Sequence, residues 1–172
     1  NSRGNYLLTI TSPDRSISSA GELESLSKPP ETTPDRALER AIKATRLAQE
    51  TIAANIEAYY TYNRVDLNGD GLNDAVAYLT GGGFCGGSGG CSIGIFQGVP
   101  GGYREVGAYS FSVTPLVVAN STTNRWQDIV IKHYAPSARQ FSEHLYQFDG
   151  TGYPGYQGGE QVNKDSLSVD RI

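Results

Sequence analysis

From Tyr59 onward the sequence consists of short apolar runs separated by Gly, Asn, Asp and Pro, and this pattern constrains the fold more than any other feature. Short runs rich in Val, Ile, Thr, Tyr and Phe, with turn residues between them, are typical of β-strands. The 21 glycines among 172 residues agree with a chain that turns often. About seven strands are therefore expected, at residues 59–65, 75–80, 92–97, 103–109, 115–119, 128–134 and 141–148.

A helix is expected before these strands. Thr33 is a good N-cap, Pro34 suits the first helical position, and Asp35 lies where the helix dipole favours an anion. Apolar side chains then recur at helical spacing, which predicts one long helix over residues 34–60. This stripe is either a partner-binding surface or, as is more usual, the face that packs on a sheet. Its members are Leu38, Ile42, Thr45, Ile52, Ile56 and Tyr59.

Length and charge define the broad class of protein. We expect a single α+β domain at residues 33–156, preceded by an arm at 1–32 with a possible edge strand at 6–10, and followed by a polar flexible tail at 157–172. The net charge of −4 argues against a nucleic-acid surface, which needs clustered Lys and Arg. No apolar run approaches the length of a transmembrane segment.

Two stretches of the chain are alike. The twelve residues from Asp66 and the twelve from Asn120 share an Asx residue at the first, fifth and ninth places, and an apolar strand is predicted after each. Residues 95–98 likewise resemble residues 147–150. These matches predict a sheet built from two degenerate blade-like repeats. The first loop has three carboxylates and the second only Asp128, so only the first is expected to bind metal.

The first loop has the spacing of a calcium site. Oxygen-bearing side chains occur at Asp66, Asn68, Asp70 and Asp74. Such spacing lets one chain wrap a hard cation, and Gly71 permits the sharp bend that this requires. An EF-hand is excluded, because Ala77 occupies the place of its bidentate Glu and both flanks have the pattern of strands.

This loop resembles the FG-GAP or VCBS-type repeat, in which Asp-x-Asn/Asp-x-Asp-Gly-x-x-Asp joins two strands around calcium. The chain is most similar to uncharacterised exported bacterial proteins, often cyanobacterial, in which a Cys-Gly-rich-Cys turn follows such a loop, here at residues 85–91. The resemblance implies a weak Ca²⁺ site with side-chain ligands from the four residues above and a backbone carbonyl from Leu72. It does not imply a propeller, because two units cannot close one.

The alternative is an Asx-rich hairpin without metal, since Asn-Gly and Asp-Gly form turns unaided. Against it, three carboxylates within nine residues repel one another unless a cation lies between them. The metal-binding hypothesis is therefore favoured over the purely structural turn.

Cys85 and Cys91 bracket five residues that are all Gly or Ser. A disulfide would restrict this floppy loop, whereas a zinc site needs further ligands that His133 and His144 do not supply at a recognisable spacing. A catalytic dithiol more often has the shorter Cys-x-x-Cys spacing. We therefore predict a structural disulfide, which favours an extracytoplasmic location, periplasmic or secreted, with a lipid anchor as one further expectation.

Two other functions, phosphate binding and hydrolysis, are not favoured by the sequence. The glycine-rich stretch 81–90 lacks the Gly-Lys-Ser/Thr ending of a P-loop. A second set, made up of Asp128, His133, Ser142 and His144, contains the residue types of a hydrolase triad. No nucleophile-elbow motif surrounds any serine, so histidines satisfied within strands are the favoured interpretation. Trp126, next to a predicted strand, is expected in the core.

These patterns lead to one functional hypothesis and two alternatives. The leading hypothesis is a non-enzymatic, calcium-stabilised extracytoplasmic bacterial domain, which presents one surface, made of its disulfide-clamped loop and the adjacent acidic hairpin, to a protein or envelope partner. One alternative is a periplasmic inhibitor that inserts the clamped loop into a hydrolase. The other, least favoured, is a hydrolase.

Overall fold

The computed structural model describes residues 8–10, 27–86, 89–135 and 139–162. An antiparallel path of seven strands runs in sequence order from β3 to β9, and β1 adds to it as a parallel neighbour of β6. The strands are β1 Leu8–Ile10, β2 Ser27–Lys28, β3 Ala58–Val65, β4 Asp74–Gly81, β5 Cys91–Val99, β6 Gly102–Thr123, β7 Trp126–Ala135, β8 Gln140–Tyr146 and β9 Glu160–Val162. The helical elements are α2 Arg36–Ala44, α3 Arg46–Ala53 and the 3₁₀ turn η1 Tyr156–Gly158.

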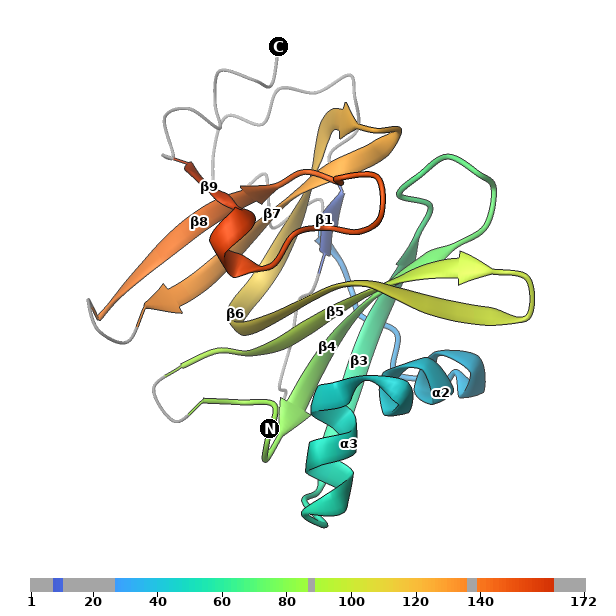
Figure 1. Ribbon diagram of the computed structural model, residues 1–172, viewed down its shortest axis with the longest axis vertical. Coiled ribbons are helices and arrows are strands. Elements are labelled where there is room, and N and C mark those ends of the chain that lie inside the picture. The colour runs from blue at the N-terminus through green and yellow to red at the C-terminus, as the bar shows by residue number, and fades with distance from the viewer. Residues whose placement is uncertain (1–7, 11–26, 87–88, 136–138, 163–172) are drawn as a thin grey trace.

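The long strand β6 divides the sheet into two halves. Residues up to Ser112 pair with β5, and residues from Ser112 onward pair with β7. Phe111, with a φ of 55°, lies at the junction, and the pairing with β7 is irregular between Val113 and Val117. Pro115 lies in this gap, where a missing N–H is tolerated. The two expected strands 103–109 and 115–119 are therefore one bent strand (Figure 1).

The first half of the sheet is covered on both faces. On one face α2 and α3 pack through a cluster that includes Leu38, Ile42 and Phe96. On the other face Val76 and Ile95 belong to the larger core cluster, together with side chains of β6, β7 and the segment after β8. Strand β4 is consequently buried from Asp74 to Leu79. Alternation along a strand places successive side chains on opposite faces, which accounts for this double coverage.

The expected single helix over residues 34–60 is wrong in extent. The α2 helix starts at Arg36, and Asp35 is its N-cap, accepting hydrogen bonds from the amides of Ala37 and Leu38. Thr45 interrupts the helix with an extended backbone, because its hydroxyl caps the start of α3 instead. Residues 34–60 thus contain two short helices, and the C-terminal part of the apolar stripe is exposed. The exposed members are Ile52, Ile56 and Tyr59.

The repeat prediction fails, because the two loops that suggested it are built differently. Each half has three successive antiparallel strands, β3–β5 and then β6–β8. Residues 66–73 form a long loop before β4. Residues 120–123 instead continue strand β6, and only Asn124 and Arg125, both with positive φ, turn the chain into β7. Asp128 is therefore the third residue of β7 rather than its first.

The ends of the chain contribute to the sheet. The expected edge strand at 6–10 corresponds in its described part to β1, which pairs with Leu116–Val118 of β6 on one side and with β2 on the other and is therefore not at an edge. The segment 157–172, expected to be a flexible tail, supplies part of η1 and all of β9, which pairs with β8. Residues 1–7, 11–26 and 163–172 lie outside the described residues. No helix in the described ranges is long and apolar enough to cross a membrane.

Candidate functional site

The acidic loop, residues 66–73, joins β3 to β4 and is held by its own backbone amides. Asp66 accepts hydrogen bonds from the amides of Gly69 at 2.8 Å and Gly71 at 2.9 Å. Both glycines have positive φ, of 70° and 85°, so the bend that directs these amides inward needs residues without a Cβ. The expected role of Gly71 as a bend residue is confirmed.

Asn68 and Asp70 are arranged around the same bend. The amide of Asp70 donates to Oδ1 of Asn68 at 2.9 Å and lies 3.3 Å from Oδ1 of Asp66. The side-chain amide of Asn68 donates to Oδ2 of Asp70 at 3.0 Å, and the amide of Leu72 donates to Oδ1 of Asp70 at 2.8 Å. The three oxygen-bearing side chains therefore converge on one stretch of backbone at the surface.

Asp74 differs from these three because it is fully buried. Its Oδ2 accepts from the amide of Leu67 and its Oδ1 from the amide of Gly98, both at 2.8 Å. Burial raises the pKa of the Asp74 carboxyl to about 6, the two amide bonds oppose this rise, and the nearby Asp70 and Asp66 carboxylates add to it. The loop therefore combines exposed oxygens with one carboxylate directed into the sheet.

The side-chain oxygen atoms of the acidic loop could bind a cation, but they do not form a preassembled metal site. Within the described part of the chain, no three His, Cys, Asp or Glu side chains converge closely enough to hold a metal ion. A carboxylate has about four lone-pair sites and an amide oxygen two. Asp66, Asn68 and Asp70 thus keep lone pairs that the loop amides do not use. Asp74 would join a site only through lone pairs left over from its two buried bonds.

The predicted disulfide is confirmed: Cys85 and Cys91 are bonded. The backbone amide of Gly86 also donates to the carbonyl of Gly90 at 3.1 Å, so the base of this loop is closed twice. Phe111 lies against the loop, because a Cβ on Gly86 would come within 2.6 Å of its ring. The Phe111 side chain is itself exposed.

The disulfide loop and the acidic loop are not adjacent, which corrects the expectation of one shared surface. The acidic loop precedes Asp74 at the start of β4, whereas the disulfide loop follows Gly81 at its end. An eight-residue strand separates its ends by roughly 25 Å. In Figure 1 the two loops extend from opposite ends of the sheet.

The residue types of a hydrolase triad do not assemble. His133 Nδ1 lies 3.3 Å from the Ser110 carbonyl, which can only accept, so Nδ1 carries the proton and Nε2 accepts from the Tyr146 hydroxyl at 2.8 Å. His144 likewise has a carbonyl, that of Gly159, near its Nδ1. No carboxylate of the described residues therefore orients either ring. Burial lowers the pKa of His133 to about 4.

The other two triad candidates have structural partners. Asp128 is buried and accepts from the hydroxyl of Ser121 at 2.7 Å and the side-chain amide of Gln147 at 3.3 Å. Ser142 bonds His144 Nε2 at 2.9 Å. The expectation that Trp126 lies in the core is confirmed, since its ring stacks on Phe148 with 4.4 Å between centroids.

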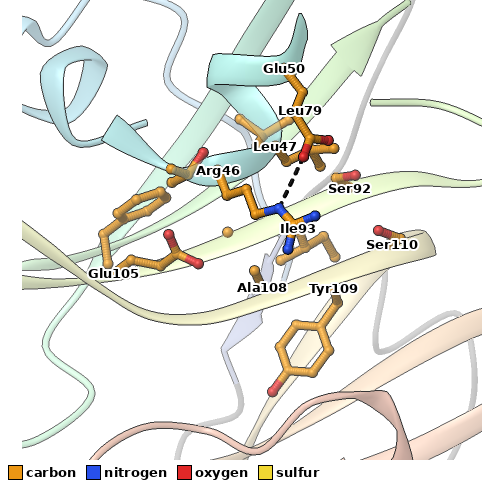
Figure 2. A pocket seen from close by; sticks show the side chains of 13 residues that line it. Arg46, Leu47, Glu50, Leu79, Ser92, Ile93, Glu105, Ala108, Tyr109 and Ser110 are labelled. Carbon is orange, nitrogen blue, oxygen red and sulfur yellow. Dashed lines mark hydrogen bonds and ion pairs between the residues drawn. The ribbon is translucent and has the colours of Figure 1, made fainter. Parts of the chain in front are cut away.

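Sequence reasoning missed a groove of about 310 Å³ between the start of α3 and the β5–β6 hairpin (Figure 2). Arg46 and Glu50 form an exposed ion pair at its rim, with 2.9 Å between Nε and Oε1. Burial raises the pKa of Glu105, whose carboxylate makes no side-chain hydrogen bond or ion pair with any described residue. No motif could reveal this groove, because its residues come from four separate elements, α3, β4, β5 and β6.

Comparison of the chain with protein-family models, with curated proteins and with solved structures finds no match. The resemblance to FG-GAP or VCBS-type repeats accordingly stays a prediction, based on the acidic loop alone.

Proposed function

We propose that the chain is a calcium-stabilised, non-enzymatic domain of an extracytoplasmic bacterial protein, with a binding or structural role. The observation that supports it most is the convergence of Asp66, Asn68 and Asp70 at one exposed bend, where each keeps unused lone pairs. Oxygen ligands of this kind suit Ca²⁺. The Cys85–Cys91 bond is compatible with an oxidising compartment.

A cation in this loop would act on the whole domain through charge. Asp66 and Asp70 both raise the pKa of the buried Asp74 carboxyl, so the three negative charges disfavour one another. A bound Ca²⁺ would reverse that effect, because an opposite charge favours the ionised form. Calcium is therefore expected to stabilise the fold rather than to switch it.

The test is thermal unfolding in chelator and in millimolar calcium. Extracellular modules bind Ca²⁺ with dissociation constants of about 10⁻⁴–10⁻³ M. Calcium at about twenty times that constant adds about 1.8 kcal/mol to the free energy of unfolding. Asp70→Ala should abolish the increment, and magnesium should substitute poorly because it demands stricter octahedral geometry.

Asp149→Ala is the matched control. Asp149 also accepts backbone amides in an exposed turn, from Thr151 at 2.8 Å and Gly152 at 3.0 Å, but the side chain that joins it there is the Thr151 hydroxyl rather than a second carboxylate or an amide. This variant should keep the calcium increment. A wild-type midpoint that does not move with calcium, together with no heat in titration calorimetry, would leave the loop as a turn only.

A second candidate is inhibition of a hydrolase by the disulfide loop. It is favoured by the doubly closed base of that loop and by the exposed Phe111 beside it. Isolation of a tight complex with a defined envelope hydrolase, lost in Phe111→Ala, would support this function. Undiminished activity of envelope hydrolases in saturating protein would exclude it.

A further inference from the structure

Strand β3 forms one edge of the antiparallel path, and half of that edge is covered. Tyr62 exchanges backbone hydrogen bonds with Glu31, at 2.7 and 3.2 Å, on the side away from β4. The amide of Arg64 faces the same side and reaches the Glu31 side chain. The segment around Glu31 therefore covers the C-terminal half of β3.

The N-terminal half of the β3 edge is uncovered. Backbone groups alternate along a strand, so the N–H and C=O of Ala58 and Tyr60 point away from β4, as those of Tyr62 do. The described chain supplies no hydrogen-bond partner for these four groups. Ala58 is exposed and Tyr60 half-buried, which agrees with an open edge.

This edge lacks the features that usually prevent strand pairing. Lys, Pro and β-bulges protect exposed edges, and very short edge strands do the same. Residues 58–60 are Ala, Tyr and Tyr, and the register with β4 is unbroken. The opposite edge, β9, has only three residues and begins with Glu160. Along the described part of the antiparallel path, the start of β3 is therefore open to another strand.

Exposed apolar side chains surround the open edge. Ile52, Ile56 and Tyr59 are 55%, 42% and 59% exposed. All three line a hollow of about 200 Å³ between the helices and the start of β3, together with Ala58 and Tyr60. Contiguous exposed apolar side chains are typical of protein interfaces. Free backbone groups beside them indicate that the partner is an extended strand.

We propose that residues 58–60 of β3 pair antiparallel with the same residues of a second copy of this chain. A two-fold axis at Tyr59 places Ala58 of each copy opposite Tyr60 of the other, which satisfies all four free groups in both copies. The two Tyr59 residues then form the close, non-hydrogen-bonded pair, where aromatic side chains contact favourably. No other two-fold register uses every free group.

Side-chain chemistry agrees with this register. Glu57 of one copy stands opposite Thr61 of the other, so no like charges face each other across the pair. The pairing ends at Tyr62, where Glu31 already occupies the edge.

The test is sedimentation velocity of the full chain from about 1 to 500 µM, in chelator and in millimolar calcium. We expect the apparent mass to double with concentration in both buffers. Ala58→Pro removes an N–H that points away from β4, so it leaves the β3–β4 ladder intact. This variant should weaken dimerisation at least tenfold, and Ile56→Glu should do the same.

Leu72→Glu is the control, because Leu72 is also 42% exposed but lies on the acidic loop. It should leave the dimerisation constant unchanged within about twofold. In the wild type, the amides of Ala58 and Tyr60 should gain hydrogen-exchange protection at high concentration, which tests the register even if Ala58→Pro fails to fold. A monomer at every concentration, or a dimer without this protection, overturns the proposal. Neither result bears on the calcium site, which the melts test separately.

Discussion

The carboxylate of Asp74 accepts a hydrogen bond from the amide of Gly98, with 2.8 Å between Oδ1 and N, across 24 residues of chain. Its other oxygen accepts from Leu67, the second residue after β3. One buried side chain thus ties the acidic loop to the end of β5. The state of this carboxyl group therefore links the candidate cation site to the stability of the sheet.

Asp74 is predicted to give the domain a pH-dependent stability. Burial raises the pKa of its carboxyl to about 6, above the 3.8 of the unfolded chain. Its contribution to stability is therefore full below pH 4 and is lost as the pH rises through about 6. A shift of this size corresponds to about 3 kcal/mol. Denaturant unfolding of wild type and Asp74→Asn at pH 4 and pH 7 should show this contribution only in the wild type.

Asp149 provides a control of opposite sign. The amides of Thr151 and Gly152 lower the pKa of its exposed carboxyl. Its contribution is therefore present above the unfolded pKa and is lost as the pH falls. The wild type should lose a little stability in acid through Asp149, and Asp149→Asn should abolish that loss. Asp74→Asn should instead abolish the loss of stability that the wild type shows toward neutral pH. Identical profiles for the two variants would contradict the assignment of Asp74.

Gly98→Ala is predicted to destabilise the junction between the acidic loop and β5. A Cβ at this position would lie 2.3 Å from the carbonyl oxygen of Asn73, which is backbone and cannot rotate away. We expect a loss of about 1–3 kcal/mol in the free energy of unfolding. Gly102→Ala, where a Cβ would meet nothing within 4 Å, should change it by less than about 0.5 kcal/mol. Equal effects of the two substitutions in denaturant unfolding would refute the steric argument.

The buried His133 is predicted to stay neutral well into acid. Burial lowers the pKa of its imidazole to about 4, so its ring signals in NMR should not titrate between pH 7 and pH 5.5. Tyr146→Phe removes the hydroxyl that donates to Nε2 and should cost about 1–3 kcal/mol. Tyr156→Phe, on an exposed ring against the same histidine, should cost less than about 0.5 kcal/mol. A His133 midpoint near pH 6.5 would contradict this environment.

The sequence predicted the strands well because alternation and turn residues are local signals. It could not predict that β6 is continuous, since the bend at Phe111 depends on pairing with β5 on one side and β7 on the other. The single long helix failed at Thr45. The apolar spacing continues past Thr45, but the Thr45 hydroxyl caps the start of α3. The sequence pattern does not show whether Thr45 continues the first helix or caps a second one.

For the candidate site, the spacing in the sequence identified the residues but not the directions in which their side chains point. Asp66, Asn68 and Asp70 do gather at one bend, whereas Asp74 turns into the sheet because Gly98, far along the chain, donates to it. The groove beneath Arg46 and the open edge at Ala58 were not predictable. Both depend on which elements lie beside one another, and no local pattern records that.

Removal of the Cys85–Cys91 bond is predicted to lower stability only modestly. The loop between the two cysteines is short, and the loop-entropy model gives about 2 kcal/mol for a closed loop of this length. The bond from Gly86 to Gly90 already restrains the same loop, so the measured loss should not exceed this value. Denaturant unfolding of the double variant Cys85→Ser/Cys91→Ser should show the loss.

Intact-mass analysis after alkylation should find both thiols of the wild type protected until reductant is added. Free alkylation of both cysteines in native protein purified from an oxidising compartment would refute the disulfide, and a loss above about 4 kcal/mol would show that it supports more than its own loop.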